Sequence, residues 1–166
     1  MESRKSKHKP VMVVVVKSDV LALDIATHTG YYSLHEGGIW NFTESIRKNN
    51  LKQHKDFRDT VMSFIQTFGI KQVVAEDINV NDFFFDMRKL SEFRGILLEI
   101  CDELNLPEPV FVNVSTLKKW ATGNGRPGKQ DMINVCQNKY RYYPKDDNEA
   151  DAFLLFHYFT RKYKID

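Results

Sequence analysis

Two short apolar runs in this chain each end in a carboxylate. Residues 20–25 carry Asp24 near their end, and Val73-Val74-Ala75 leads directly into Glu76. A run that is apolar on both faces is typical of a central strand in a parallel sheet. A carboxylate at the end of such a strand is costly to bury unless it is paired or holds a cation. The pattern therefore favours an α/β fold with an acidic site at one edge of its sheet.

A third acidic group opens the last apolar stretch of the chain, at residues 147–151. Asp147 and Asp151 are four residues apart and share one helix face with Asn148, whereas Glu149 points elsewhere. Asp151 is the strongest candidate, because buried apolar residues follow it immediately. Each carboxylate also has an ordinary structural explanation. Asp24 could cap the bend after its strand, and Glu76 could be a solvated strand end. Asp147 and Asp151 could reflect the preference of acids for a helix N-terminus.

If these groups meet, they form a site made of oxygen ligands, which suits Mg²⁺ or Mn²⁺. Two such ions about 3.5–4 Å apart activate a water and stabilise the leaving oxygen during phosphodiester cleavage. No side chain must then act as a covalent nucleophile. Asp77 follows Glu76 and faces the opposite side of the strand, so it is the weaker candidate.

The chain of 166 residues is long enough for one domain with a substantial core. We assign residues 1–19 to a basic tail, whose apolar run at 11–16 is either an extra edge strand or a swapped arm. Residues 20–166 form the folded domain. We expect strands at 20–25, 30–34, 39–42, 72–76 and 110–114, and helices at 51–68, 84–105, 115–120, 130–140 and 147–163.

The glycines at 37 and 38 indicate a hairpin, so the first three strands are antiparallel and the later ones parallel. Ser115 is expected to cap the third helix. The fold class is thus α/β, with a mixed five-stranded sheet flanked by helices.

Four motifs resemble RuvC-type Holliday-junction resolvases, in the order in which that family carries them. DIATHTGYYSL resembles the first strand and hairpin, VVAED the second acidic strand, TGNGRPGK the family's T-G-N-G-R-A-x-K loop, and NEADA its last helix. The turn after Asp24 reads D-I-A where the family has D-P-G. Each motif is weak alone, and the ordered set with the TGNGR loop is specific.

The resemblance implies a ribonuclease H-like fold, Mg²⁺-dependent cleavage of branched DNA and a homodimer. Carried over by motif, the metal ligands are Asp24, Glu76 and Asp151, with two Mg²⁺ (or Mn²⁺ as a substitute) in each active site. The family's fourth acidic ligand falls on Asn148 here. That position therefore stays open between Asp147, through a small helix shift, and the carbonyl of Asn148.

Basic residues around residues 122–129 form the expected DNA-binding surface. Glycines in this loop can expose backbone N–H groups, and nearby cations can contact phosphates. The candidate residues are Lys118, Lys119, Asn124, Arg126 and Lys129. The alternative is an ordinary polar loop between helices.

Three consecutive phenylalanines, at residues 83–85, cannot all face one core. They fit a core, a dimer interface or a stacking surface for an unpaired base. Cys101 and Cys136 lie in apolar helical patterns and are expected to be buried, reduced thiols. No cysteine and histidine cluster suggests zinc, and nothing suggests a small-molecule cofactor.

Three hypotheses follow. The leading one is an Mg²⁺-dependent endonuclease that resolves four-way DNA junctions by paired symmetric nicks. The second keeps the fold but acts on other branched DNA or on RNA–DNA hybrids, and the third is a non-catalytic junction-binding protein. The run at 11–16 is too short to span a bilayer. We expect a cytoplasmic protein without a membrane partner, and a phage or mobile element is the hypothesis for its source.

Overall fold

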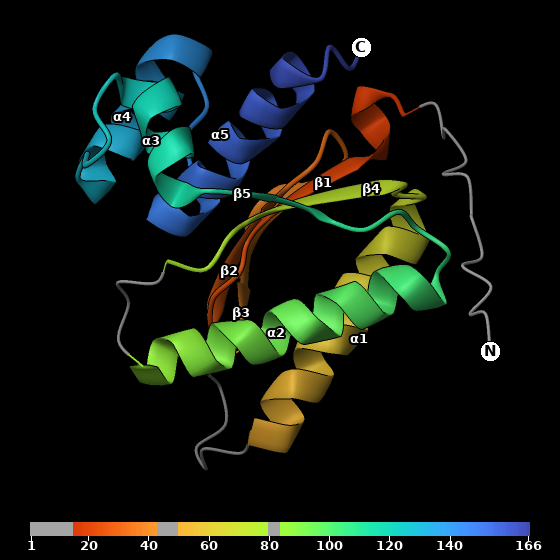
Figure 1. Cartoon of the computed structure of the whole chain (residues 1–166). Helices are drawn as coiled ribbons and strands as arrows, with labels where there is room; N and C mark the ends of the chain where they lie inside the picture. The colour runs from red at the N-terminus through yellow and green to blue at the C-terminus, as the bar shows by residue number, and fades with distance from the viewer. Residues whose placement is uncertain (1–14, 43–49, 80–83) are drawn as a thin grey trace, which may run out of the picture.

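A mixed five-stranded sheet forms the centre of the protein (Figure 1). The structure is a computed structural model that describes residues 15–42, 50–79 and 84–166. The strands are β1 (Val20–Asp24), β2 (His28–Tyr32), β3 (Gly37–Asn41), β4 (Gln72–Glu76) and β5 (Val110–Val112). Their order in the sheet is β3-β2-β1-β4-β5. The pairs β1–β2 and β2–β3 are antiparallel, and β1–β4 and β4–β5 are parallel, which confirms the predicted sheet.

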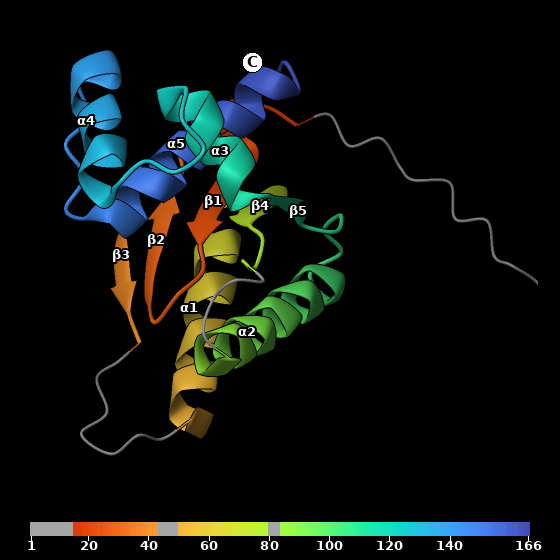
Figure 2. The same cartoon turned by 60° about the vertical axis from the view of Figure 1, so that its left-hand side comes forward.

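Helices cover both faces of this sheet. The first two, α1 (Asn50–Phe68) and α2 (Phe84–Glu103), lie together on one face. The other face carries α3 (Val114–Thr122), α4 (Lys129–Tyr140) and α5 (Asp147–Lys162). Figure 2 shows the sheet between the two groups of helices. The fold is therefore a three-layer α/β arrangement with a core on each side of the sheet.

Strand β1 contributes to both cores by strict alternation of its side chains. Leu21 and Leu23 pack in the core under α1 and α2, whereas Val20 and Ala22 pack in the core under α5. Because successive side chains point to opposite faces of a strand, Asp24 falls on the α5 side. The burial pattern of β1 thus decides which layer the first carboxylate faces.

Helix α5 is the helix most deeply buried against the sheet. Its middle turns are buried almost all round, from Ala152 to Phe156, which is typical of a helix enclosed by other elements. It contacts β1, β2 and β4 below and α3 and α4 at its sides. The position of α5 over the sheet is consequently fixed along its whole length.

A glycine in β2 lets the first turn of α5 lie directly on the sheet. A Cβ atom built on Gly30 would lie 2.0 Å from the backbone oxygen of Asn148. No real Cβ makes such a contact, so any other residue would push the helix away. Gly30 also pairs with Asp24 across the β1–β2 ladder. The first turn of α5 is therefore seated beside the end of β1.

The start of α3 differs from the prediction. Strand β5 ends at Val112 rather than at 114, and the helix cap is Asn113 rather than Ser115. The Asn113 side chain accepts hydrogen bonds from the backbone N–H groups of Ser115 and Thr116. Asparagine caps a helix as well as serine does, so the earlier residue ends the strand and starts the helix.

The N-terminal segment is described from residue 15 onward. Val15 and Val16 are not in a strand and lead into a short 3₁₀ helix, Lys17–Asp19. The rest of the apolar run at 11–16 lies outside the described residues, and the boundary at residue 19 stays a prediction.

Both cysteines are free and buried, as predicted. No helix in the described part of the chain is long and apolar enough to cross a membrane.

Substituting Gly30 by alanine tests the close contact between β2 and α5. We expect Gly30→Ala to lower the free energy of unfolding by at least about 3 kcal/mol, the upper end of ordinary overpacking, because the obstructing atoms belong to the backbone. Gly95→Ala is the matched control, since nothing lies within 4 Å of its Cβ position inside α2. The control should gain about 0.5–1 kcal/mol in a urea titration. Equal stability of Gly30→Ala and the wild type would contradict this account of the packing.

Candidate metal centre

The sheet register brings the first two carboxylates side by side. In the parallel pair β1–β4, Leu23 lies opposite Ala75, so the next residues along each strand are Asp24 and Glu76. Asp24 lies two residues after Ala22, and Glu76 lies two residues after Val74. Ala22 and Val74 both pack in the core under α5. The two side chains therefore leave the same edge of the sheet toward the same helix.

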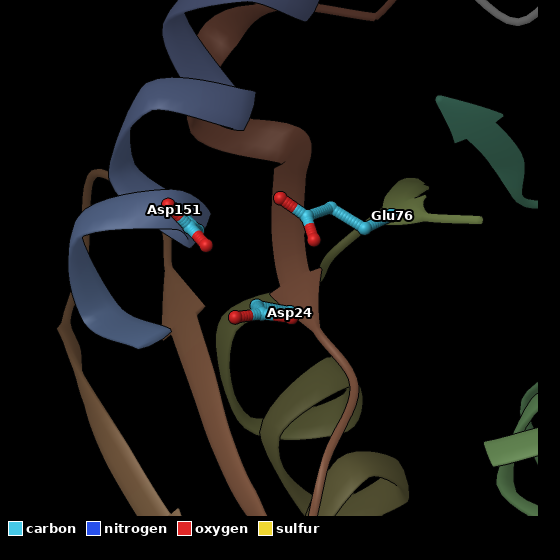
Figure 3. Close-up of side chains that lie close together, drawn as sticks. All are labelled: Asp24, Glu76 and Asp151. Atoms are coloured by element: carbon cyan, nitrogen blue, oxygen red, sulfur yellow. The ribbon is translucent and has the colours of Figure 1, made fainter. Parts of the chain in front are cut away.

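Helix α5 supplies the third carboxylate. Asp151 lies three residues after Asn148, whose carbonyl rests on Gly30. One oxygen each from Asp24, Glu76 and Asp151 lies within 4.8 Å of the others. Figure 3 shows the three side chains, from β1, β4 and α5, facing a shared space. The structure thus brings together the three acidic residues that the sequence singled out.

These carboxylates lie in a cleft of about 250 Å³. It is lined by Asp24, Ile25, Ala26, Glu76, Asp77, Ile78, Asn79, Leu90, Arg94, Val114, Lys118 and Asp151. The three clustered carboxylates and Asp77 thus share the cleft with two cations, Arg94 of α2 and Lys118 of α3.

Burial raises the pKa of all three carboxyl groups, and repulsion between the acids adds to the rise at Asp24 and Asp151. Burial is the largest cause for Asp24, whose pKa lies well above its usual range, and the charges of Glu76 and Asp151 add to it. Burial raises the pKa of Glu76 to about 7, although Lys118 opposes the rise. Burial and Glu76 together raise the pKa of Asp151 to about 8. Without a cation, the cluster therefore retains protons near neutral pH.

Two oxygens of the cluster have no hydrogen-bond partner. Oε1 of Glu76 and Oδ1 of Asp151 are both buried, and no partner is found for them among the described residues. A buried polar atom without a partner costs free energy, and a buried anion without one costs more. Hard divalent cations take carboxylate oxygens as ligands. The donor set and its unpaired oxygens therefore fit a magnesium or manganese ion.

The residues proposed for a fourth ligand lie beside this cluster. The charge of Asp147 contributes to the raised pKa of Asp24 and Asp151, so it is close enough to act on them. Its Oδ2 atom lies 3.6 Å from Nζ of Lys129. Neither Asp147 nor Asn148 is among the residues that line the cleft. Asp147 is thus an outer acid in this structure, held by a cation of the glycine-rich loop.

Glu149 points away from the cluster, as predicted. It is buried and accepts a hydrogen bond of 2.9 Å from the hydroxyl of Tyr142 and another from the backbone N–H of Lys145. The N-cap of α5 is Asp146, whose side chain accepts from the Glu149 N–H. These bonds fix the first turn of α5 and hence the position of Asp151.

Of the two cations that line the cleft, the sequence predicted a functional role for only one. Lys118 was expected near DNA, and the structure places it in the wall of the cleft. Arg94 was missed. Its guanidinium carbon lies 3.8 Å from the centre of the Phe111 ring, and its Nε lies 3.6 Å from Oδ1 of Asp77. Asp77 lies just beyond the end of β4, so the alternation of the strand no longer fixes its face, and it lines the cleft beside Arg94. Arg94 gave no sequence signal, because only the packing of α2 brings it to β4.

The glycine-rich loop is exposed beside the cleft, but two of its glycines are not free to bind a ligand. The N–H of Gly123 bonds to the carbonyl of Lys119, and the N–H of Gly128 bonds to the Asp131 side chain at 2.8 Å. These bonds end α3 and begin α4, so the backbone N–H groups of these two glycines are not exposed for phosphates. The side chains of Lys119, Asn124, Arg126 and Lys129 are exposed.

The phenylalanine run is described only in part. Phe84 begins α2 and is 71% exposed. Phe83 and the side chain of Phe85 lie outside the described residues.

This arrangement of sheet and helices is the fold of RuvC-type resolvases, as the likeness to three solved structures shows. The T. thermophilus RuvC bound to a Holliday junction substrate is similar over 87% of this chain and 95% of its own, with a TM-score of 0.67 and 16% identity. A second Thermus thermophilus RuvC structure gives a TM-score of 0.66 at 17% identity, over 87% and 96% of the two chains.

A eukaryotic protein shares the fold as well. The yeast mitochondrial Holliday junction resolvase Ydc2 gives a TM-score of 0.58 at 12% identity, over 87% of this chain and 78% of that one. No protein-family model matches the chain, and no curated protein sequence matches it at a significant level. The likeness thus lies in the fold.

The raised pKa values predict how stability changes with pH in the presence of a chelator. These carboxyl groups bind protons more tightly in the folded chain, so their contribution to stability is complete below about pH 4 and is lost as the pH rises through about 7 and 8. Asp24→Asn removes one buried charge. We therefore expect this variant to gain stability relative to the wild type between about pH 5 and pH 8.

Urea midpoints at several pH values measure this difference. Asp102→Asn, an exposed acid on α2 outside the cleft, is the control and should show no such trend. A difference between Asp24→Asn and wild type that does not change with pH would show that the carboxylates do not repel one another in the folded chain.

Proposed function

We propose that this protein is an Mg²⁺-dependent endodeoxyribonuclease that resolves four-way (Holliday) DNA junctions by paired symmetric nicks. The observation that carries the proposal is the cluster of Asp24, Glu76 and Asp151, with its unpaired buried oxygens, in a cleft at the carboxyl ends of β1 and β4. Magnesium is the resident ion of the proposal, with manganese as a substitute and two ions at each site. The fold supports a junction as substrate, because one similar structure is a RuvC bound to a Holliday junction substrate.

Asp24, Glu76 and Asp151 would hold the ions, and Asp147 would add negative charge from the outer edge. Bound divalent ions in such sites lower the pKa of a water and stabilise charge on the leaving oxygen. The three carboxylates come from two strands and a buried helix, so their positions are set by rigid elements rather than by a loop. That rigidity orients the ligands before DNA arrives.

Lys118 and Arg94 would contact the phosphate that is cut. Both line the cleft with the acids. The charge of Lys118 acts on Glu76 and Asp151 already, since it lowers the pKa of each. The Arg94 guanidinium lies over the Phe111 ring and lines the cleft, and its N–H donors suit a phosphate. These cations balance the acids and attract the substrate.

The exposed loop after α3 would bind the DNA backbone. Lys119, Asn124, Arg126 and Lys129 are exposed beside the cleft, and Lys129 reaches Asp147 at the first turn of α5. Contacts of this kind position a duplex without reading its sequence. They would place the cleft over one strand of a junction arm.

A homodimer would provide the second nick. The described residues of one chain hold a single group of three acids, whereas symmetric resolution cuts two strands. A two-fold dimer presents two identical sites to a two-fold junction. The proposal therefore includes a dimer in solution with DNA.

Asp24→Asn should abolish cleavage while junction binding remains. Losing a residue that only supports a metal ligand costs about 10–100-fold, so the loss of a ligand itself should exceed about a hundredfold. The measurement is Mg²⁺-dependent nicking of a synthetic four-way junction, with binding followed by gel shift in a chelator. Asp102→Asn carries the same charge change at an exposed site and should cut as the wild type does.

Each outcome of this assay separates the hypotheses. Junction cutting by Asp24→Asn at the wild-type rate would contradict the metal assignment. Tight junction binding by a wild type that cuts no substrate would favour a non-catalytic binding protein. Faster cutting of flaps or RNA–DNA hybrids than of junctions would move the proposal to a related nuclease.

Lys118→Gln and Lys119→Gln form a second matched pair. Lys118 lines the cleft, whereas its neighbour Lys119 is exposed and does not line it. We expect Lys118→Gln to reduce single-turnover cleavage about a hundredfold, as removal of one group that stabilises transition-state charge does elsewhere. Lys119→Gln should weaken binding and lower its salt slope by about one, with the rate at saturating DNA retained. Identical behaviour of the two variants would contradict a role for Lys118 inside the cleft.

A further inference from the structure

A second cavity lies at the opposite end of α5 from the metal centre. It has a volume of about 350 Å³. Its lining residues come from the start of the described chain, the end of α4 and the end of α5, and they are Lys17, Tyr140, His157, Thr160, Arg161, Lys164, Ile165 and Asp166. Asp151 and Arg161 are ten residues apart on this helix, which is about 15 Å along its axis. The cavity is therefore distinct from the metal centre.

Three cations line this cavity without an ion-pair partner. Within the residues that the structure describes, Lys17, Arg161 and Lys164 take no part in any salt bridge. Asp166 is the acid in the wall, and its backbone oxygen accepts a hydrogen bond from the Lys17 N–H at 2.8 Å. Like charges gathered around a concave surface attract an anion.

The turn that ends α5 keeps one of these cations at the cavity. Lys164 has a φ of 50°, in the left-handed region that glycine usually occupies after a helix. The backbone N–H of Ile165 bonds back to the carbonyl of Thr160 at 2.8 Å and closes this turn. A residue with a Cβ atom is less stable in that conformation than glycine. Position 164 therefore holds a lysine in a backbone conformation that glycine adopts with less strain.

Two polar atoms in the cavity wall lack partners. Nε2 of His157 and the hydroxyl of Tyr140 are buried, and neither makes a hydrogen bond of normal geometry in the described part of the chain, although the Arg161 side chain lies close to the hydroxyl. The Arg161 guanidinium is close enough to Tyr140 to oppose the rise that burial causes in its pKa. Burial, with Lys17 and Arg161, lowers the pKa of His157 to about 4. The imidazole is therefore neutral and can donate one hydrogen bond.

We propose that this cavity binds a phosphate group. Arginine and lysine side chains are the usual ligands of phosphate oxygens, and a neutral imidazole and a phenol add donors without charge. A phosphate has enough acceptor oxygens for several donors at once, which a chloride ion or a single water does not match. A metal cation is excluded by the three positive charges. The phosphate belongs either to the backbone of a DNA arm outside the cleft or to a small phosphate compound.

The first experiment uses inorganic phosphate as the probe and the Asp24→Asn protein without divalent ions. Amide and imidazole signals are followed by NMR during titration at constant ionic strength, with chloride as the balancing anion. We expect saturable shifts at His157 and at residues 160–166. In Arg161→Gln/Lys164→Gln, two charge-assisted hydrogen bonds are lost, so the phosphate affinity should fall at least about tenfold.

Lys139→Gln/Lys162→Gln is the matched control. It removes the same charge from α4 and α5, but neither lysine lines the cavity, and their amino groups lie over aromatic rings instead. Phosphate affinity within about twofold of the parent is expected for this control. An equal loss in both double variants, or no saturable binding in the parent, would overturn the proposal. Because no cleavage is measured, failure here leaves the proposed nuclease untouched.

A second arm assigns the source of the phosphate and depends on the proposed function. Junction binding by the same Asp24→Asn proteins is measured over a range of salt concentrations. If the phosphate is a DNA backbone group, the cavity variant should weaken binding and lower the salt slope by up to about two, relative to the control. If it is a small phosphate compound, junction binding should match the control while the loss of inorganic phosphate binding persists.

Discussion

The gathering of three carboxylates in a cleft that shields them from water is the constraint on which the site depends. One carboxylate oxygen from each of Asp24, Glu76 and Asp151 lies within 4.8 Å of the other two. Burial is the largest cause of the raised pKa at each of the three. Such a cluster destabilises the folded chain when it is ionised, unless positive charge is supplied. Lys118 supplies part of it from α3. The charge that Lys118 does not balance is the basis for proposing that the cleft holds divalent ions.

The packing of the sheet and of α5 holds the three carboxylates close together. The β1–β4 register fixes the two strand carboxylates, and the burial of α5 between sheet and helices fixes the third. Gly30 is the point where these two parts meet, since the carbonyl of Asn148 occupies the space that a side chain would need. The helix cannot withdraw to separate the charges without losing its buried face. The free energy gained by packing the core therefore offsets the unfavourable electrostatic energy of the clustered carboxylates.

Much of the sheet and of the acidic cluster was predictable from the sequence, because both follow from the spacing of apolar residues and from where the acids stand relative to them. Apolar runs that end in Asp24 and Glu76 predict parallel neighbours, and the spacing within the last helix places Asp151 where burial begins. What could not be predicted depends on contacts between distant segments. Arg94 reaches the cleft only through the packing of α2, and the second cavity forms only where the two ends of the described chain meet. The capping by Asn113 was missed because neighbouring residues are equally good caps.

The metal assignment is the central claim, and anomalous diffraction from crystals soaked in manganese tests it most directly. Manganese takes the same oxygen ligands as magnesium and can be located by its own scattering. The account predicts anomalous peaks within about 2.0–2.3 Å of carboxylate oxygens from Asp24, Glu76 and Asp151. An empty cleft in such crystals, with these side chains turned away from one another, would contradict it.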